Sequence, residues 1–267
     1  MKWIGAFTDI HDQKESEQKL EALVAQRTLD LERSNEDLQR FAHVASHDLK
    51  EPIRKIKTFA SRLQDELKNS INEKGKLYLD KVQSATDRMF TMIDGVLIYS
   101  GINASEQPIE NVDLNKIMKD IETDLELLIQ QKAAVIQHHQ LPIIEGASVL
   151  LYQLFYNLIN NSIKFSKPYE SPVITLTSNI IEEEGIVMAR IIVEDNGIGF
   201  DAENAEKIFD TFARLHSKDK YEGTGLGLAL CKKIIQRHKG DIYARSEPGK
   251  GSQFFIFLPL RQEQHFV

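Results

Sequence analysis

The chain has 267 residues, of which 42% are hydrophobic, and its formal net charge at pH 7 is −7. This apolar fraction is too high for a disordered chain, and the single cysteine, Cys231, excludes a disulfide scaffold or a multi-cysteine zinc site. The acidic balance argues against general nucleic-acid binding, and no apolar run is long enough to span a membrane. The N-terminal sequence MKWIGAFTDIHDQK lacks the apolar core of a secretion signal, so we expect a cytoplasmic protein of one to three domains.

Two tracts between residues 12 and 103 have the alternating three- and four-residue hydrophobic spacing of coiled coils. In the first tract the spacing changes near Pro52, whose ring crowds the carbonyl of residue 48, and this predicts a bend. The segment KNSINEKG separates the tracts, which predicts two helices in an antiparallel hairpin. One hairpin cannot bury both apolar seams, so we expect a parallel homodimer with a four-helix bundle over 20–103. The seam positions are Leu20, Val24, Arg27, Leu31, Ser34, Leu38, Phe41, Ala45, Leu49, Ile53, Ile56, Ala60, Leu63 and Leu67, then Tyr78, Val82, Ala85, Met89, Met92, Val96 and Tyr99.

After residue 105, short β-like runs alternate with helical runs and glycine-rich turns. The segment 102–113 is predicted to be a linker. Helices are predicted at 113–131, 146–166, 205–212 and 225–240, the last with Gly240 just past its end, and strands at 133–138, 171–180, 186–195, 241–247 and 252–260. Helices interleaved with largely antiparallel strands favour an α/β two-layer sandwich.

The first candidate site is the segment SHDLKEP at 46–52. His47 falls on a solvent-facing heptad position, and an exposed neutral imidazole is a nucleophile near neutral pH. Asp48 is placed to accept the proton of the other ring nitrogen. A solvated surface histidine is the commoner explanation of a lone His, and the adjacent Asp and Pro lower its weight without deciding the matter. His43 and His47 form only a weak metal pair, because no third ligand is evident.

The second candidate site is the helix that carries Asn157, Asn160, Asn161 and Lys164. Asn157, Asn161 and Lys164 share one face at i, i+4 and i+7. Amide oxygens suit a Mg²⁺ ion shared with phosphates, and a lysine suits the phosphates themselves. The alternative is a polar solvent face, which is unusual for so many asparagines because Asn is a poor helix former.

Two glycine-containing turns complete the set. The segment DNGIGF at 195–200 follows a strand, allows close approach of a flat ligand, and offers the Asp195 carboxylate to an exocyclic amine such as that of adenine. Its alternative is an ordinary Asn-Gly turn. The segment GTGLGL at 223–228 opens a helix and presents N–H groups to phosphate, although it is neither a Rossmann fingerprint nor a P-loop. The polar stretch 213–222 before it is a candidate lid.

Together these residues resemble the sensor histidine kinases of two-component signalling over about residues 41–260. FAHVASHDLKEPI is similar to the H box of that family, NLINNSIKF to the N box, DNGIGF to the G1 box, IFDTF to the F box and GTGLGL to the G2 box, and GKGSQFFIFLP resembles the closing turn and strand. The SHDLKEP variant resembles the H boxes of phytochrome-like and related PAS-linked kinases. The implied fold is multidomain, α plus α/β: a coiled-coil helix, an antiparallel helical hairpin dimerising into a four-helix bundle, and an α/β two-layer sandwich of the Bergerat ATP-binding type.

The resemblance also implies a division of the chain and an activity. The segments are a C-terminal PAS remnant at 1–12, a coiled-coil signalling helix at 13–40, a dimerisation and phosphotransfer hairpin at 41–103, a linker at 104–112 and a catalytic ATP-binding domain at 113–267. The implied activity is ATP-dependent autophosphorylation on a histidine, then transfer to an aspartate of a response regulator. ATP and Mg²⁺ are the implied cofactors. The implied partners are a second copy, a receiver domain docked near 51–67, and an upstream PAS or other sensor module, with no nucleic acid and no membrane contact in this segment.

By the same resemblance each motif residue has an implied role. His47 is the phosphoacceptor and Asp48 its acid/base partner. The nucleotide residues are Asn161 as the Mg²⁺ ligand with Asn157 beside it, Lys164 on phosphate, Asp195 on adenine, Gly197, Gly199, Gly223, Thr224, Gly225, Leu226 and Gly227 around the pocket, and Phe212 as the lid anchor. Glu51 replaces the Thr or Asn common in the family, which puts phosphatase activity in doubt. The remaining alternatives are an ATPase or serine kinase of the wider gyrase–Hsp90–kinase–MutL (GHKL) group, which lacks the H box on a hairpin, and a non-catalytic dimeric signalling adaptor, against which the intact boxes argue.

Overall fold

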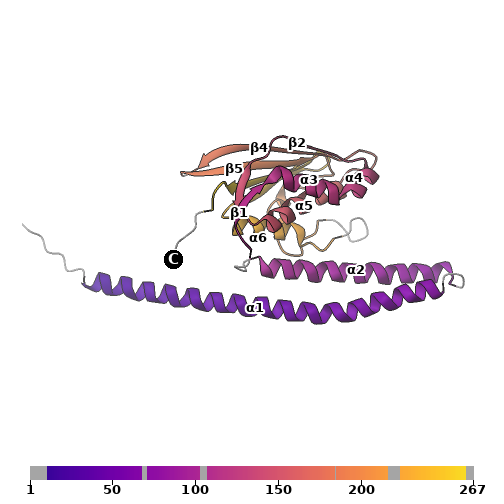
Figure 1. Ribbon diagram of the computed structural model, residues 1–267, viewed down its shortest axis with the longest axis horizontal. Coiled ribbons are helices and arrows are strands. Elements are labelled where there is room, and N and C mark those ends of the chain that lie inside the picture. Colours follow the sequence, from indigo (N-terminus) through magenta and orange to yellow (C-terminus); the bar gives the residue numbers. More distant parts are fainter. Residues whose placement is uncertain (1–10, 68–70, 103–106, 184, 216–222, 263–267) are drawn as a thin grey trace, which may run out of the picture.

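A computed structural model of the chain describes residues 11–67, 71–102, 107–183, 185–215 and 223–262. Helices α1 (His11–Glu66) and α2 (Glu73–Gly101) form an antiparallel hairpin, and the residues after them form an α/β domain. In Figure 1, α2 lies between α1 and the α/β domain. The predicted hairpin followed by an α/β sandwich is confirmed, whereas nearly all of the predicted PAS remnant at 1–12 lies outside the described residues. In the described ranges we find no helix with an apolar stretch long enough to cross a membrane.

The long helix α1 continues through Pro52 and curves along its length, as Figure 1 shows. Proline removes a backbone donor and crowds the preceding turn, so a curved rather than straight helix is expected around it. Helix α2 begins where a side chain can cap it: Oδ1 of Asn72 accepts a hydrogen bond from the Gly75 N–H at 2.8 Å. The predicted break between the two helices is therefore confirmed.

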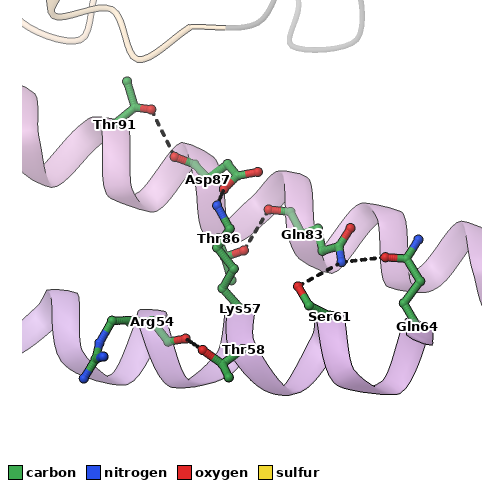
Figure 2. A network of polar contacts seen from close by, with 9 residues as sticks. All are labelled: Arg54, Lys57, Thr58, Ser61, Gln64, Gln83, Thr86, Asp87 and Thr91. Carbon is green, nitrogen blue, oxygen red and sulfur yellow. Dashed lines mark hydrogen bonds and ion pairs between the residues drawn. The ribbon is translucent and has the colours of Figure 1, made fainter. Parts of the chain in front are cut away.

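Polar contacts at intervals of seven residues fix the register of the hairpin. The pairs are Lys50–Asp94 (Nζ to Oδ1, 2.5 Å), Lys57–Asp87 (Nζ to Oδ1, 2.5 Å) and Gln64–Asp80 (Nε2 to Oδ1, 3.3 Å). Figure 2 shows the side chain of Lys57 reaching Asp87. In the same figure, Nε2 of Gln83 on α2 donates a hydrogen bond to Oε1 of Gln64 on α1 at 2.8 Å. Exposed ion pairs stabilise little, so their main effect is on register, because a slip of one residue breaks all of them. This register places His47 level with residue 97 of α2.

Most of the predicted heptad seam is exposed in the single chain. Only a few seam residues, among them Ile53 and Ala60, are buried, as is Ile93 of α2. Such a long exposed apolar stripe is expected where a partner covers it, and it supports a homodimer, which stays a prediction. The exposed seam residues are Leu20, Val24, Leu31, Leu38, Phe41, Leu49, Ile56, Leu63, Leu67, Tyr78, Val82, Met89 and Met92.

The α/β domain contains a five-stranded sheet in the order β2-β4-β5-β7-β6, in which β2 and β4 are parallel and the other neighbours antiparallel. A separate antiparallel pair, β1 with β3, lies beside it. The strands are β1 (Glu110–Asp113), β2 (Val135–His138), β3 (Ile143–Gly146), β4 (Val173–Glu183), β5 (Ile186–Asp195), β6 (Asp241–Glu247) and β7 (Gly251–Pro259). The predicted strands at 171–180 and 186–195 are confirmed as β4 and β5, which pair antiparallel, and the predicted strands at 133–138, 241–247 and 252–260 are confirmed as β2, β6 and β7.

The helices of this domain lie between the sheet and α2 in Figure 1, so one face of the sheet is covered. They are α3 (Leu114–Asp124), α4 (Glu126–Lys132), α5 (Ser148–Lys164) and α6 (Gly227–Arg237), with short turns η1 (Ala202–Asn204) and η2 (Lys207–Phe209). The apolar stripe of α5, including Leu154 and Leu158, is fully buried in one core with strand residues such as Ile174 and Ile191. Burial of this stripe holds α5, and with it the asparagine face, against the sheet.

Several details of the predicted elements are wrong. The end of the predicted linker 104–112 belongs to β1, where Val112 is buried against β3, a strand that the sequence analysis missed. The predicted helix 113–131 is two helices, because the chain turns at Leu125, whose side chain is buried in the core. The predicted helix 205–212 contains only η2, since burial of two apolar residues there does not need a full helix, and a segment this short does not nucleate one readily.

The end of α6 also differs from the prediction. Lys239 (φ 55°), not Gly240, is the left-handed residue after the helix. The Lys239 N–H donates to Gln236 O and the Gly240 N–H to Ile235 O, both at 3.0 Å, which is a Schellman motif. Glycine at 240 is required for a different reason: a Cβ there would lie 2.1 Å from the carbonyl oxygen of Phe257 on β7.

A fully buried histidine joins two helix ends. Nε2 of His238 accepts a hydrogen bond from the Ala147 N–H at 3.0 Å, at the start of α5. Its Nδ1 lies 2.8 Å from Ile234 O, so the neutral tautomer with the proton on Nδ1 satisfies both contacts. Burial lowers the pKa of His238 below its usual value, and the charge of Arg237 lowers it further. A protonated ring could not accept from Ala147, so the fold depends on the neutral form.

We expect this histidine to make folding stability depend on pH. Because the pKa of His238 is lower in the folded chain than in the unfolded one, its contribution is complete above pH of about 6.5 and is lost as the pH falls below that value. Urea unfolding of the wild type at pH 7.5 and 5.5 should show the lower free energy of unfolding at pH 5.5. In His238→Gln the difference between the two pH values should be smaller, and an equal difference in both proteins would contradict the assignment.

Candidate active site

A cavity of about 490 Å³ opens where α5, the end of β5, the start of α6 and one face of α2 meet. This volume is in the range of small-molecule sites. The predicted nucleotide residues that line it are Asn157, Asn161, Lys164, Asp195, Gly199, Gly223, Thr224, Gly225 and Gly227. Gly197, Phe212 and Leu226 are not among the lining residues, and neither are His47 and Asp48. The structure thus brings together most of the predicted nucleotide residues and leaves the predicted phosphoacceptor outside.

Helix α5 supplies one wall of the cavity. Asn157 and Asn161 lie against the first residue of α6: a Cβ at Gly227 would sit 3.8 Å from Asn157 and 3.9 Å from Asn161. Oδ1 of Asn157 is 3.3 Å from Nε2 of Gln153, but its buried Nδ2 has no hydrogen-bond partner among the described residues. An unsatisfied buried amide is costly, so a polar ligand is expected at this wall. Lys164 is close to Gly223, where an added Cβ would lie 2.6 Å from the ammonium nitrogen.

At the end of β5, the carboxylate of Asp195 is buried and held by hydrogen bonds. Oδ1 accepts from the N–H groups of Gly197 (2.9 Å) and Ser252 (3.3 Å), and Oδ2 accepts from Oγ of Ser162 (3.2 Å). Burial raises the pKa of Asp195, and these hydrogen bonds act in the opposite direction. The carboxylate therefore has a fixed orientation at the cavity wall, as a group that recognises an amine requires.

Sequence analysis missed Ser162 and Ser252. Ser162 is a polar residue within the buried stripe of α5, and Ser252 follows the PGKG turn. These positions in the sequence were only weak indications that the two serines belong to the site. Gly197 supports Asp195 from behind, because a Cβ there would lie 2.8 Å from the Asp195 Oδ1 and 2.7 Å from Phe165 O. The glycine is needed for this close approach rather than for contact with the cavity.

The glycine-rich loop before α6 is braced by the start of the predicted lid. The Phe212 N–H donates to Gly225 O at 2.9 Å, and Nη1 of Arg214 donates to Gly223 O at 2.7 Å. Phe212 has a left-handed backbone (φ 64°) and a half-exposed side chain, whereas Ala213, Arg214 and Leu215 line the cavity. The predicted lid at 213–222 continues through 216–222, outside the described residues, so the role of Phe212 as its anchor stays a prediction.

Helix α2 forms a further wall that sequence analysis did not predict. Its residues Ser84, Asp87, Arg88 and Thr91 line the cavity. No local pattern signalled this, because the contact depends on how two separately folded parts of the chain dock.

The hairpin and the α/β domain dock next to this wall, through contacts between α2 and α6. A Cβ on Gly95 would lie 2.8 Å from the side chain of Leu226 at the start of α6. Farther along, Nζ of Lys233 donates to Tyr99 O at 2.6 Å and lies 4.0 Å from the ring centroid.

His47 is exposed on α1, as predicted, with Nδ1 3.2 Å from Oδ1 of Asp48. A proton on Nδ1 directed at Asp48 leaves the lone pair of Nε2 free, which is the arrangement of an activated nucleophile. Within the described part of the chain no cluster of three or more potential metal ligands is found, at His43 or elsewhere. Helix α2 lies between α1 and the α/β domain (Figure 1), and no described residue of α1 lines the cavity, so His47 lies outside it.

Two protein-family models match the chain in succession. The His Kinase A (phospho-acceptor) domain matches residues 37–105, and the Histidine kinase-, DNA gyrase B-, and HSP90-like ATPase matches residues 146–262. The chain belongs to the two-component sensor histidine kinases. The phospho-acceptor match contains His47, and the ATPase match contains the cavity-lining residues of α5, β5 and α6.

Individual relatives agree with this assignment. Phytochrome-like protein Cph1 of Synechocystis sp. is 37% identical over 237 residues, 89% of this chain and 31% of Cph1. Sensor histidine kinase WalK of Bacillus subtilis is 29% identical over 241 residues, 87% of this chain and 38% of WalK. The crystal structure of full-length ShkA in complex with AMPPNP has the same fold (TM-score 0.64, 21% identity, 84% of this chain and 46% of ShkA). The chain spans about a third of the length of the curated relatives that it matches.

Proposed function

We propose that this chain is the kinase portion of a sensor histidine kinase, which transfers the γ-phosphoryl group of ATP to His47 and then to an aspartate of a response regulator. The observation that carries the proposal is the convergence of the N, G1 and G2 residues on one cavity in a chain that also carries an exposed His–Asp pair. Cavity and histidine are separate parts of one fold, as a mobile catalytic domain requires.

The proposed roles follow the contacts. Asp195, fixed by Ser162, Gly197 and Ser252, accepts a hydrogen bond from the adenine amine. Lys164 and the N–H groups at the start of α6 bind the phosphates, because this helix end carries a partial positive charge.

For the transfer, the catalytic domain moves so that the γ-phosphate meets Nε2 of His47. The new N–P bond forms as the bond to the β-phosphate oxygen breaks, ADP leaves, and the Nδ1 proton is shared with Asp48. Most of the rate acceleration comes from positioning and charge stabilisation.

We further propose that Asn161 holds a Mg²⁺ ion shared with the phosphates. Amide oxygens are suitable ligands for magnesium, and Asn161 lies beside Lys164 and the glycine-rich loop, where phosphates would bind. The unpartnered Nδ2 of Asn157 one turn earlier supports a polar ligand at this wall. Bound Mg²⁺ would neutralise phosphate charge as the γ-phosphoryl group leaves.

The proposed partners are a second copy of the chain and a receiver domain. The exposed heptad seam supports the second copy, since it is the surface that a four-helix bundle would bury. The receiver domain is proposed to dock near residues 51–67, beside His47, so that its aspartate can reach the phosphohistidine. An upstream PAS or other sensor module stays a proposal from sequence alone.

The acid stability of ³²P label transferred to the protein distinguishes a histidine kinase from the alternatives. When the chain is incubated with Mg²⁺ and [γ-³²P]ATP, we expect protein-bound label that is lost in acid and retained in alkali, as a phosphohistidine requires. Acid-stable label would favour the serine-kinase alternative, and ATP hydrolysis without label would favour the ATPase. A non-catalytic adaptor predicts neither label nor hydrolysis, and absence of ATP-dependent thermal stabilisation would support it.

A further inference from the structure

One face of α2 is turned toward the catalytic domain along much of its length. Ser84, Arg88 and Thr91 line the cavity, and Gly95 and Tyr99 contact α6. Their spacing of four, three, four and four residues places them on a single face of the helix. The nucleotide cavity of this chain is therefore closed on one side by the dimerisation hairpin and not only by the catalytic domain.

Arg88 is the cationic residue of this wall. It lines the cavity, and its guanidinium makes no hydrogen bond or ion pair with any described residue. The neighbouring acidic residue, Asp87, also lines the cavity, and its carboxylate is paired with Lys57 of α1 at 2.5 Å (Figure 2) rather than with Arg88. A guanidinium that lines a cavity and has no partner among the described residues is suited to a phosphate group.

The docking contacts indicate which end of the nucleotide Arg88 meets. Gly95 packs against Leu226, directly before the start of α6, where the phosphates are proposed to bind. Arg88 lies two turns from Gly95 on the same face, and it lines the same cavity as Gly223, Gly225 and Gly227 at that helix end.

The same register separates this wall from His47. His47 is level with residue 97 of α2, so Arg88 lies 9 residues, or about 13 Å, from it along the helix axis. His47 also lies on α1, no described residue of which lines the cavity, whereas four residues of α2 do. A nucleotide bound in this arrangement is held away from its phosphoacceptor.

We propose that Arg88 of α2 binds the phosphates of ATP, so that the hairpin completes the nucleotide site in the docked arrangement and holds ATP apart from His47. This inference rests on the proposed function, because it needs ATP in the cavity. It adds a nucleotide-binding residue from outside the catalytic domain.

The test is Mg²⁺–ATP affinity of the whole chain, measured by calorimetry. In Arg88→Ala we expect the affinity to fall about tenfold, as for loss of a hydrogen bond to a charged group. Arg88→Lys should recover part of it. The affinity for adenosine, which has no phosphate, should be unchanged in competition measurements. The matched control is Lys76→Ala, an exposed α2 cation outside the cavity, and it should bind Mg²⁺–ATP like the wild type.

A second substitution tests whether Arg88 contributes to binding only while α2 is in contact with α6. Gly95→Leu introduces a side chain where even a Cβ would lie 2.8 Å from Leu226, so it should displace α6 from α2. In that background Arg88→Ala should change the affinity less than twofold. Wild-type affinity in Arg88→Ala, or an equal loss in both backgrounds, would overturn the inference and leave the proposed function intact. If the unchanged chain fails to bind Mg²⁺–ATP, the proposed function fails and this inference with it.

Discussion

Replacing His47 with glutamine is expected to abolish acid-labile phosphorylation of the chain. The label from [γ-³²P]ATP should fall by at least about a hundredfold, because no other group replaces a missing nucleophile. Mg²⁺–ATP affinity should stay at the wild-type value, since His47 is exposed on α1 and does not line the cavity. The two measurements together separate a lost acceptor from a lost nucleotide site.

The matched control is His43→Gln, which removes an exposed imidazole from the preceding turn of α1. It should accept label at the wild-type rate. Equal acid-labile label in His47→Gln and the wild type would show that another residue is the phosphoacceptor. Asp48→Asn should slow labelling without abolishing it, because Asp48 orients the ring at 3.2 Å and does not itself accept the phosphoryl group.

Replacing Asn161 with alanine is expected to remove the effect of Mg²⁺ on ATP binding. Its amide oxygen is the proposed metal ligand, so affinity for Mg²⁺–ATP should fall by about a hundredfold, which corresponds to ~2.7 kcal/mol of binding free energy. The affinity for ATP measured in excess EDTA should be similar in the variant and the wild type. Calorimetric titration of each protein with and without Mg²⁺ measures all four affinities.

Asn179→Ala is a suitable control, because Asn179 lies on β4 away from the cavity and binds Arg190 through its amide oxygen. It should retain the Mg²⁺ dependence of the wild type. Unfolding curves without nucleotide should be the same for Asn161→Ala and the wild type if the asparagine serves the ligand rather than the fold. Unchanged Mg²⁺–ATP affinity in Asn161→Ala would remove the metal assignment.

Much of the fold was predictable because its signals are local. Heptad spacing predicted the hairpin, and the β-like runs at 171–180 and 186–195 predicted β4 and β5, since such patterns are local. Where the prediction was wrong, the deciding contact was distant in sequence. Strand β1 exists because it pairs with β3, and the break at Leu125 exists because that side chain enters the core.

The candidate site divides in the same way. The asparagine face of α5 could be found in the sequence because several asparagines, which are poor helix formers, are unusual within one helix. The glycine-rich turns could be found because close approach of the backbone to a ligand requires glycine. Ser162 and Ser252 were missed, since a single serine has no distinctive pattern until its hydrogen bond to Asp195 is seen.

The sequence alone determined the helical hairpin, helices α5 and α6, strands β2, β4, β5, β6 and β7, and the chemical groups that they carry, because helix and strand periodicity and glycine-rich turns act over a few residues. Only the tertiary structure decided which of those groups share a cavity. It brought α5, the end of β5 and the start of α6 together, closed them with Arg88 and its neighbours from α2, and left His47 outside. The physical reason is that docking depends on the shape and charge of whole surfaces, such as Gly95 admitting Leu226, which no stretch of sequence records.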